Sequence, residues 1–311
     1  MPGRHGRHLT TAECSTDIMD QRVRPTSNTP RALGWMTLAL VSFSLVAIAG
    51  RGAAKQATTL EIVFYRSAVS LLPIVLWAIA TRQLGMVTRP SRLPLHGLRA
   101  VTHLIGQCSW LYALTLIPLA QLFALEFTAP LWVAGLAPLL LGERMSATRA
   151  LAAVLGFIGA IIVVRPGTLS MGLGEGLALL SALGFALGML CTKGLTSTEP
   201  AARILFYMFL IQTSICGAMA LPAIRSLDAS TWLWICALAA CGLTAHYSLV
   251  RAFELADSII VAPMDFFRLP LIAAVGVLLY NEPLDPIVLA GGGVVVLANI
   301  INLVSERRRA R

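Results

Sequence analysis

Two carboxylates stand inside long apolar runs of this chain and are the first candidates for chemistry. Glu126 lies in "FALEFTAPLW" and Asp265 lies in "VAPMDFFRLP". A charged side chain at the centre of a membrane helix costs about 2.5–3.5 kcal/mol on insertion scales, so such residues are usually kept for function. Each carboxylate can bind an amine or carry a proton. For Asp265 an internal ion pair is the other interpretation, because Arg268 follows one helical turn later.

Two arginines also lie inside apolar runs, Arg66 in "FYRSAV" and Arg268 in "DFFRLP". A guanidinium group can hold a carboxylate with two parallel hydrogen bonds, so either arginine is a candidate for capturing a carboxylate ligand. The alternative is that each arginine neutralises an acid of the protein itself, for which Glu126, Asp265 and Glu61 are available.

Histidine, glutamine and aromatic side chains complete the predicted site. His103 and Gln107 are four residues apart and share one helical face, while His246 lies in a later apolar run. Histidine can change its charge near neutral pH, and the other interpretation is a core histidine with satisfied hydrogen bonds. Aromatic residues either line a cavity or form a belt at the membrane interface. The candidates for a cavity wall are Tyr65, Trp110 and Tyr247.

The composition predicts an all-α membrane protein. The chain has 311 residues, of which 57% are hydrophobic and 13% charged, and its mean hydropathy is +0.78. A soluble domain carries about 25% charged residues. The net charge of +9 fits basic loops beside anionic lipid, and without a basic helical face we expect no nucleic-acid partner. None of the six cysteines forms a CxxC pair, so neither a zinc site nor a disulfide framework is indicated. We expect no metal and no cofactor.

Ten apolar stretches have about the length of 20 residues that a membrane-spanning helix needs. Short polar segments such as "LGERMSATR" and "YNEPLDP" separate them. The expected spans are 33–54, 60–80, 97–116, 119–141, 149–165, 173–192, 203–223, 231–254, 258–280 and 286–304.

The distribution of Lys and Arg predicts the orientation of these spans. With the N-terminus inside, eighteen of the 24 Lys and Arg residues fall in cytoplasmic segments and four on the opposite side. This bias is the positive-inside pattern of cytoplasmic loops. We therefore expect cytoplasmic tails at residues 1–31 and 305–311.

An internal repeat divides the chain into residues 32–166 and 172–304. At an offset of 139 residues Glu126 matches Asp265 and Glu143 matches Glu282, while Gln107 matches His246. Each unit holds five expected spans, and because five is odd the two units must insert in opposite senses. Two inverted five-helix repeats are the architecture of many secondary transporters, which bind substrate between the repeats near the midplane.

These features together resemble the EamA family of the drug/metabolite transporter superfamily. The residues that carry the resemblance are "GER" with Glu143, "NEP" with Glu282 and "FYRSAV" with Arg66. The resemblance covers residues 33–304 and implies solute transport across the bacterial inner membrane without ATP hydrolysis. The stretches "APMDFFRLPLIA" and "LLYNEPLDP" resemble a subgroup of metabolite exporters and of riboflavin or S-adenosylmethionine importers.

We therefore expect a secondary transporter and not an enzyme, since no intramembrane protease motif and no P-loop occur. Two acids and two bases suit a small substrate with both an amine and a carboxylate. An amino acid or an opine-type metallophore fits, and export is the expected direction. Import of a cofactor-like metabolite of the riboflavin or S-adenosylmethionine type is the alternative. The sequence leaves open whether the protein forms a homodimer.

Overall fold

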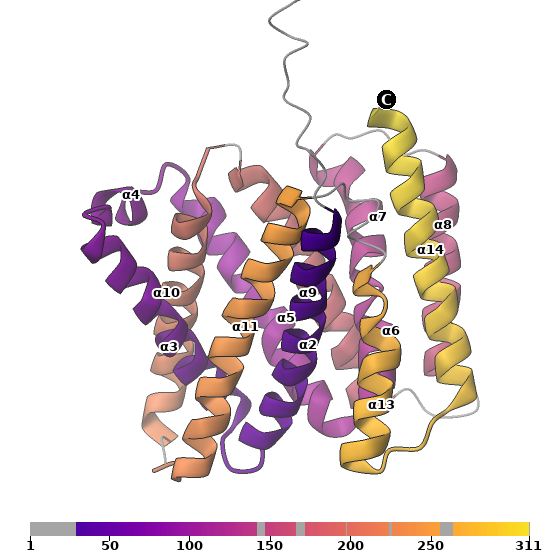
Figure 1. Ribbon diagram of the computed structural model, residues 1–311, viewed down its shortest axis with the longest axis horizontal. Helices are drawn as coiled ribbons and strands as arrows, with labels where there is room; N and C mark the ends of the chain where they lie inside the picture. Colours follow the sequence, from indigo (N-terminus) through magenta and orange to yellow (C-terminus); the bar gives the residue numbers. More distant parts are fainter. Residues whose placement is uncertain are drawn as a thin grey trace, which may run out of the picture.

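A computed structural model describes residues 29–141, 147–165, 172–196, 198–223, 226–255 and 264–310. These residues form helices joined by short connections, and no strand occurs among them (Figure 1). The helices of the first half are α2 (Thr29–Ala53), α3 (Thr59–Ala80), α4 (Leu84–Thr88), α5 (Leu93–Leu116), α6 (Leu119–Glu126), α7 (Ala129–Leu141) and α8 (Ala147–Val164). Those of the second half are α9 (Leu173–Thr196), α10 (Ala201–Ala220), α11 (Ala229–Leu255), α13 (Arg268–Tyr280) and α14 (Pro286–Ala310), with a 3-10 turn at Leu221–Ala223.

Every one of the ten expected spans contains a helix, and the all-α prediction is confirmed for the described residues. Within the part of the chain that the structure describes, six segments are long and apolar enough to cross a membrane: 30–53, 59–80, 119–137, 173–192, 201–220 and 229–249. The short helix α4 was not predicted, and α14 continues through residues 305–310 of the expected tail. Residues 1–28 and Glu143 lie outside the described residues.

The helices pack in pairs that join the two halves of the chain. The most extensive contacts are those of α2 with α11, α5 with α9, α8 with α14 and α3 with α10, and α6 also packs on α13. The first described helix begins and the last one ends on the same side of the molecule (Figure 1). The core therefore lies between helices that are distant in sequence.

Small residues let α5 and α9 approach closely, as the "GFALG" segment predicts. A β-carbon at Gly184 of α9 would lie 2.7 Å from both the Cα and the backbone nitrogen of Gly106 on α5. These neighbours are backbone atoms, so they cannot rotate away as a side chain can. The position requires glycine because of the helix contact and not because of its own backbone angles.

Gly184→Ala is expected to destabilise the protein although alanine favours helices. The added methyl group must push two backbones apart, and overpacking of this kind costs about 1–3 kcal/mol. Gly176→Ala in the same helix is the matched control, because a β-carbon there meets no atom within 4 Å. Thermal unfolding of the purified protein in detergent should give a lower midpoint for Gly184→Ala and an equal or higher one for Gly176→Ala. Equal midpoints for Gly184→Ala and the wild type would contradict the close contact.

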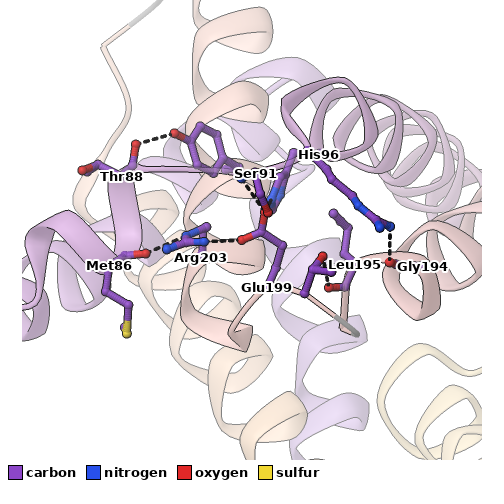
Figure 2. A network of polar contacts seen from close by, with 11 residues as sticks. Met86, Thr88, Ser91, His96, Gly194, Leu195, Glu199 and Arg203 are labelled. Atoms are coloured by element: carbon purple, nitrogen blue, oxygen red, sulfur yellow. Dashed lines mark hydrogen bonds and ion pairs between the residues drawn. The ribbon is translucent and has the colours of Figure 1, made fainter.

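Glu199, in the connection between α9 and α10, is the centre of a polar network at one end of the molecule (Figure 2). Its carboxylate accepts hydrogen bonds from the backbone nitrogen and hydroxyl of Ser91, at 2.7 and 2.6 Å, and pairs with Arg203. The Nε2 atom of His96 lies 3.5 Å from the same carboxylate, and Nε of Arg203 donates to the carbonyl of Met86. The network therefore fastens α4 and the start of α5 to α10.

Glu199→Gln is expected to lower the stability of the protein in a pH-dependent way. Burial raises the pKa of Glu199, but its hydrogen bonds with Ser91 and Arg203 outweigh burial and lower the pKa from 4.5 to about 2. The stabilisation is therefore complete above the ordinary pKa and is lost as the pH falls through the lowered one. Thermal midpoints of the two proteins should differ by a constant amount from neutral pH down to about 5 and converge between about 4.5 and 2. If the difference between the two thermal midpoints does not change across this pH range, the carboxylate of Glu199 is not ionised in the folded protein as described.

The turn between α5 and α6 is held by an ion pair from two other parts of the chain. Arg51 of α2 donates to the carbonyls of Leu114 and Ile117, at 2.8 and 2.9 Å, and pairs with Glu282. Glu282 also accepts from the first backbone nitrogen of α6, that of Leu119, at 2.8 Å. The free carbonyls at the end of α5 and a free N–H at the start of α6 are thereby satisfied. Glu282 thus caps helix α6.

Candidate functional site

Both predicted carboxylates lie where a helix is interrupted. Helix α6 ends at Glu126, and the turn residues Phe127 and Thr128 precede α7. The same pattern occurs 139 residues later, where Asp265 is helical, two turn residues follow and α13 begins at Arg268.

Two prolines explain the positions of these breaks. Pro130 has no N–H for the carbonyl of Glu126, four residues earlier, and Pro270 has none for that of Phe266. A break inside a membrane protein needs other hydrogen-bond partners for its backbone. Asn299 of α14 supplies one, since its side-chain nitrogen donates to the carbonyl of Phe127 at 2.7 Å.

The carboxylates converge on one guanidinium group, and we call the four residues Trp110, Glu126, Asp265 and Arg268 the carboxylate cluster. Nη2 of Arg268 lies 3.2 Å from Oε1 of Glu126 and 3.4 Å from Oδ2 of Asp265. Nε1 of Trp110 donates to Oε2 of Glu126 at 2.7 Å. The expected i, i+3 pair of Asp265 and Arg268 is therefore present, and Arg268 also neutralises Glu126 across the interface of the two halves.

Aromatic rings surround the guanidinium group of Arg268. Its central carbon lies 4.8 Å from the ring centre of Phe43 and 5.1 Å from those of Phe123 and Phe127. Arg268 is only 7% exposed, and rings at these distances stabilise a desolvated cation. With both carboxylates ionised, the carboxylate cluster carries two negative charges and one positive charge. It is therefore a net acidic site in a largely apolar surrounding.

A second group of polar residues is basic, and we call Arg66, Arg99, His103 and His246 the arginine–histidine cluster. Gln212 joins His103 to Ser67, the residue after Arg66, and Arg99 lies one turn before His103 on α5. His246 lies one turn after Gly242, which faces the guanidinium of Arg66, and its ring meets that of Phe43 edge-on at 5.5 Å between centres. Among the described residues, Nη1 of Arg66 has no hydrogen-bond partner and no ion pair involves this arginine. Arg66 thus forms none of the pairs with Glu126, Asp265 or Glu61 that the sequence left open.

Gln212 on α10 belongs beside the arginine–histidine cluster and was missed by the sequence reasoning. It is fully buried, its Nε2 lies 3.0 Å from Nδ1 of His103, and its Oε1 accepts from the hydroxyl of Ser67 at 3.3 Å. These bonds join α3, α5 and α10. The signal that could have found it is the same as for Gln107: one amide inside an apolar run, "FLIQTSIC".

One face of α5 connects the two clusters. Arg99, His103, Gln107 and Trp110 follow one another at spacings of four, four and three residues, so they lie on one helical face. The opposite face carries exposed apolar side chains, among them Leu98 at 55% and Ile105 at 45%. The Oε1 atom of Gln107 is buried and without a hydrogen-bond partner among the described residues. Helix α5 thus turns its polar face inward and its apolar face outward, as expected for a helix between lipid and a polar interior.

The three predicted aromatic residues occupy different surroundings. Trp110 is 7% exposed and belongs to the carboxylate cluster. Tyr65 packs against Trp232, with ring centres 4.7 Å apart. Tyr247 is 59% exposed and meets Trp35 edge-on, so the structure does not bring it to either cluster.

Comparison with known proteins gives similarity along almost the whole chain. The riboflavin transporter of Rhizobium johnstonii is 29% identical over 291 residues, which cover 89% of this chain and 92% of that protein. The S-adenosylmethionine uptake transporter of Rickettsia prowazekii is 24% identical and covers 88% and 92%. The pseudopaline exporter of Pseudomonas aeruginosa is 28% identical and covers 85% and 92%. These relatives are transporters and not enzymes, and their names include both uptake and export.

Two further comparisons concern the fold and the family. A solved crystal structure superposes with a TM-score of 0.62 at 15% identity, over 90% of this chain and 99% of that one, which supports the fold alone. The EamA-like transporter family model matches residues 30–165 and, a second time, residues 172–304. The all-helical fold, the apolar segments and both matches agree, and the chain belongs to the EamA-like transporter family.

Proposed function

We propose that this protein is a secondary transporter of the bacterial inner membrane that exports a small amphoteric metabolite. The observation that carries the proposal is the pair of inward-facing clusters, one net acidic and one basic, joined by a single face of α5. A substrate amine or a proton would bind at Glu126 or Asp265, and a substrate carboxylate would bind at Arg66. An amino-acid-derived compound of the opine type has both groups.

The transport mechanism that we propose is alternating access by two inverted repeats of five spans each. Exchanging the repeats turns the pair α2 with α11 into the pair α9 with α5, and it maps the pairs α3 with α10 and α8 with α14 onto themselves. The helix breaks at Glu126 and Asp265 are also related by the offset of 139 residues. Both termini would be cytoplasmic, in keeping with the distribution of Lys and Arg.

Import of a cofactor-like metabolite is the second candidate function. Two of the three relatives described above are a riboflavin transporter and an S-adenosylmethionine uptake transporter. The same clusters suit S-adenosylmethionine, which is itself a cation with an amino-acid part. The direction of transport separates the two candidates.

Metabolite profiling of cells and medium tests the proposal. Three strains are compared: one without the gene, one with the wild-type gene and one with the Glu126→Gln gene as an inactive, membrane-inserted control. Export predicts a compound that accumulates inside the cells of the first and third strains and appears in the medium of the second. Loss of uptake of supplied riboflavin or S-adenosylmethionine in the first strain would support import instead. Identical profiles in all three strains would contradict transport of a metabolite.

A further inference from the structure

We propose that the substrate is an elongated molecule with a carboxylate at one end and a cation at the other, held along α5 between the two clusters. This inference rests on the proposed transport function and adds the length and polarity of the substrate. Four observations carry it: a buried arginine without an ion pair among the described residues, an excess of carboxylate, the spacing along α5 and the polar groups between the clusters.

Arg66 is the anchor for the carboxylate. The residue is 8% exposed, and its Nη1 is buried without a hydrogen-bond partner among the described residues. Burying a charge without a partner is costly, so such a group is retained only where something else requires it. On α11, Gly242 has no side chain that would cover the guanidinium, since even a β-carbon there would lie 3.4 Å from Nη2. A carboxylate ligand would supply the missing acceptors.

Asp265 is the anchor for the cation. Its Oδ2 shares Arg268 with Glu126, so one guanidinium faces two carboxylates. Its Oδ1 is buried and has no hydrogen-bond partner among the described residues. An amine of the substrate would donate to this oxygen and balance the excess negative charge.

The spacing along α5 sets the length of the substrate. His103 is joined through Gln212 to Ser67, the residue after Arg66. Trp110, which is bonded to Glu126, follows His103 by seven residues, about 10 Å along a helix. The amine and carboxylate of an α-amino acid are separated by two covalent bonds, about 3 Å in total. A free α-amino acid is therefore too short to reach both clusters with these two groups.

The groups between the two clusters suit a polar or aromatic middle part of the substrate. Gln107 lies between His103 and Trp110 on α5, and its buried Oε1 has no partner among the described residues. The ring of His246 packs against Phe43, which also covers the guanidinium of Arg268. His246 follows by one turn Gly242, the residue of α11 that faces Arg66. Both side chains can accept a hydrogen bond from a bound molecule.

Thermal stabilisation of the purified transporter by simple amphoteric probes tests the length. The probes are glycine, γ-aminobutanoate and ω-aminooctanoate, whose ends are about 10 Å apart when extended. Octanoate and octylamine are the matched controls, because each has the same chain and only one of the two charges. We expect ω-aminooctanoate to stabilise the protein more than every other probe. Equal stabilisation by ω-aminooctanoate and γ-aminobutanoate, or by ω-aminooctanoate and octylamine, would overturn the proposal.

Variants of Arg66 test the carboxylate anchor. In Arg66→Gln the half-saturating concentration of ω-aminooctanoate should rise by about tenfold or more, because a hydrogen bond to a charged group is lost. Arg66→Lys, which keeps the charge, should recover part of this loss. The thermal midpoint of Arg66→Gln without probe should equal or exceed that of the wild type, since a buried unpaired charge has been removed. A clear fall of this midpoint would mean that Arg66 is structural and would overturn the proposal.

The same measurements separate this inference from the transport function. Binding is measured on purified protein and does not require transport, whereas the three-strain profiling does not depend on the length of any probe. If the Arg66→Gln variant exports the compound at the wild-type rate, the proposed transport function stands and this inference about the substrate is wrong. If binding depends on probe length and on Arg66 but the profiles of the three strains are identical, the inference about the ligand stands and the transport function is wrong.

Discussion

Glu126→Gln is expected to abolish transport while the protein still folds and inserts into the membrane. The amide has the same shape and can still accept the hydrogen bond of Trp110, which is 2.7 Å long in the wild type. It lacks the charge that holds a cation or a proton and that balances Arg268. A hydrogen bond to a charged group is worth about 1.5–3 kcal/mol, so transport should fall at least about tenfold.

The measurement is the rate at which the gene-dependent compound crosses the membrane, normalised to the amount of transporter in the membrane. Glu175→Gln is the matched control, because Glu175 accepts a hydrogen bond from Gln121 at 3.0 Å, outside both clusters. It should transport at the wild-type rate. Asp265→Asn should resemble Glu126→Gln. Wild-type transport by both cluster variants would exclude a role for the carboxylates.

Arg268→Met is expected to unfold or strongly destabilise the protein. The substitution leaves Glu126 and Asp265 facing each other without a counter-charge, and breaking a buried ion pair by removing one partner costs about 3–5 kcal/mol. The thermal midpoint and the yield of folded protein in detergent should both fall. The expected fall in the thermal midpoint is opposite in sign to the effect expected for Arg66→Gln, although both arginines are more than nine-tenths buried.

Two variants test the reason for this loss. Arg89→Met removes an exposed arginine outside the clusters and should leave the midpoint unchanged. The triple variant Arg268→Met, Glu126→Gln and Asp265→Asn removes the unpaired charges along with the arginine and should recover most of the stability. If the triple variant is as unstable as Arg268→Met alone, the role of Arg268 is packing against the phenylalanine rings and not charge balance.

The helices were predictable from the sequence because each expected span is a long apolar run ended by Pro, Gly or charged residues. The interruption of the fourth span follows from Pro130, whose ring removes one hydrogen bond of the helix. Helix α4 was missed because its five residues, "LGMVT", are too few to show a helical periodicity. The local pattern around Asp265 and Arg268 also predicted their ion pair, since residues three apart share a helical face.

The long-range contacts of the site were not predictable in this way. Arg268 reaches Glu126 across 142 residues of sequence, and Ser91 reaches Glu199 across 108. The periodicity of the residues within one helix does not indicate which other helix packs against it. For the same reason the sequence left Arg66 with three possible acidic partners.

The ion pair of Arg51 and Glu282 has a consequence for the biosynthesis of the protein. The two residues are 231 positions apart, so Arg51 emerges from the ribosome long before its partner exists. Until residue 282 has been made, the turn after α5 lacks the carboxylate that caps α6, and Arg51 has no counter-ion there. The turn is thus completed only when the last helix of the chain is about to be synthesised. A chain truncated before residue 282 would therefore lack both the counter-ion of Arg51 and the carboxylate that caps α6.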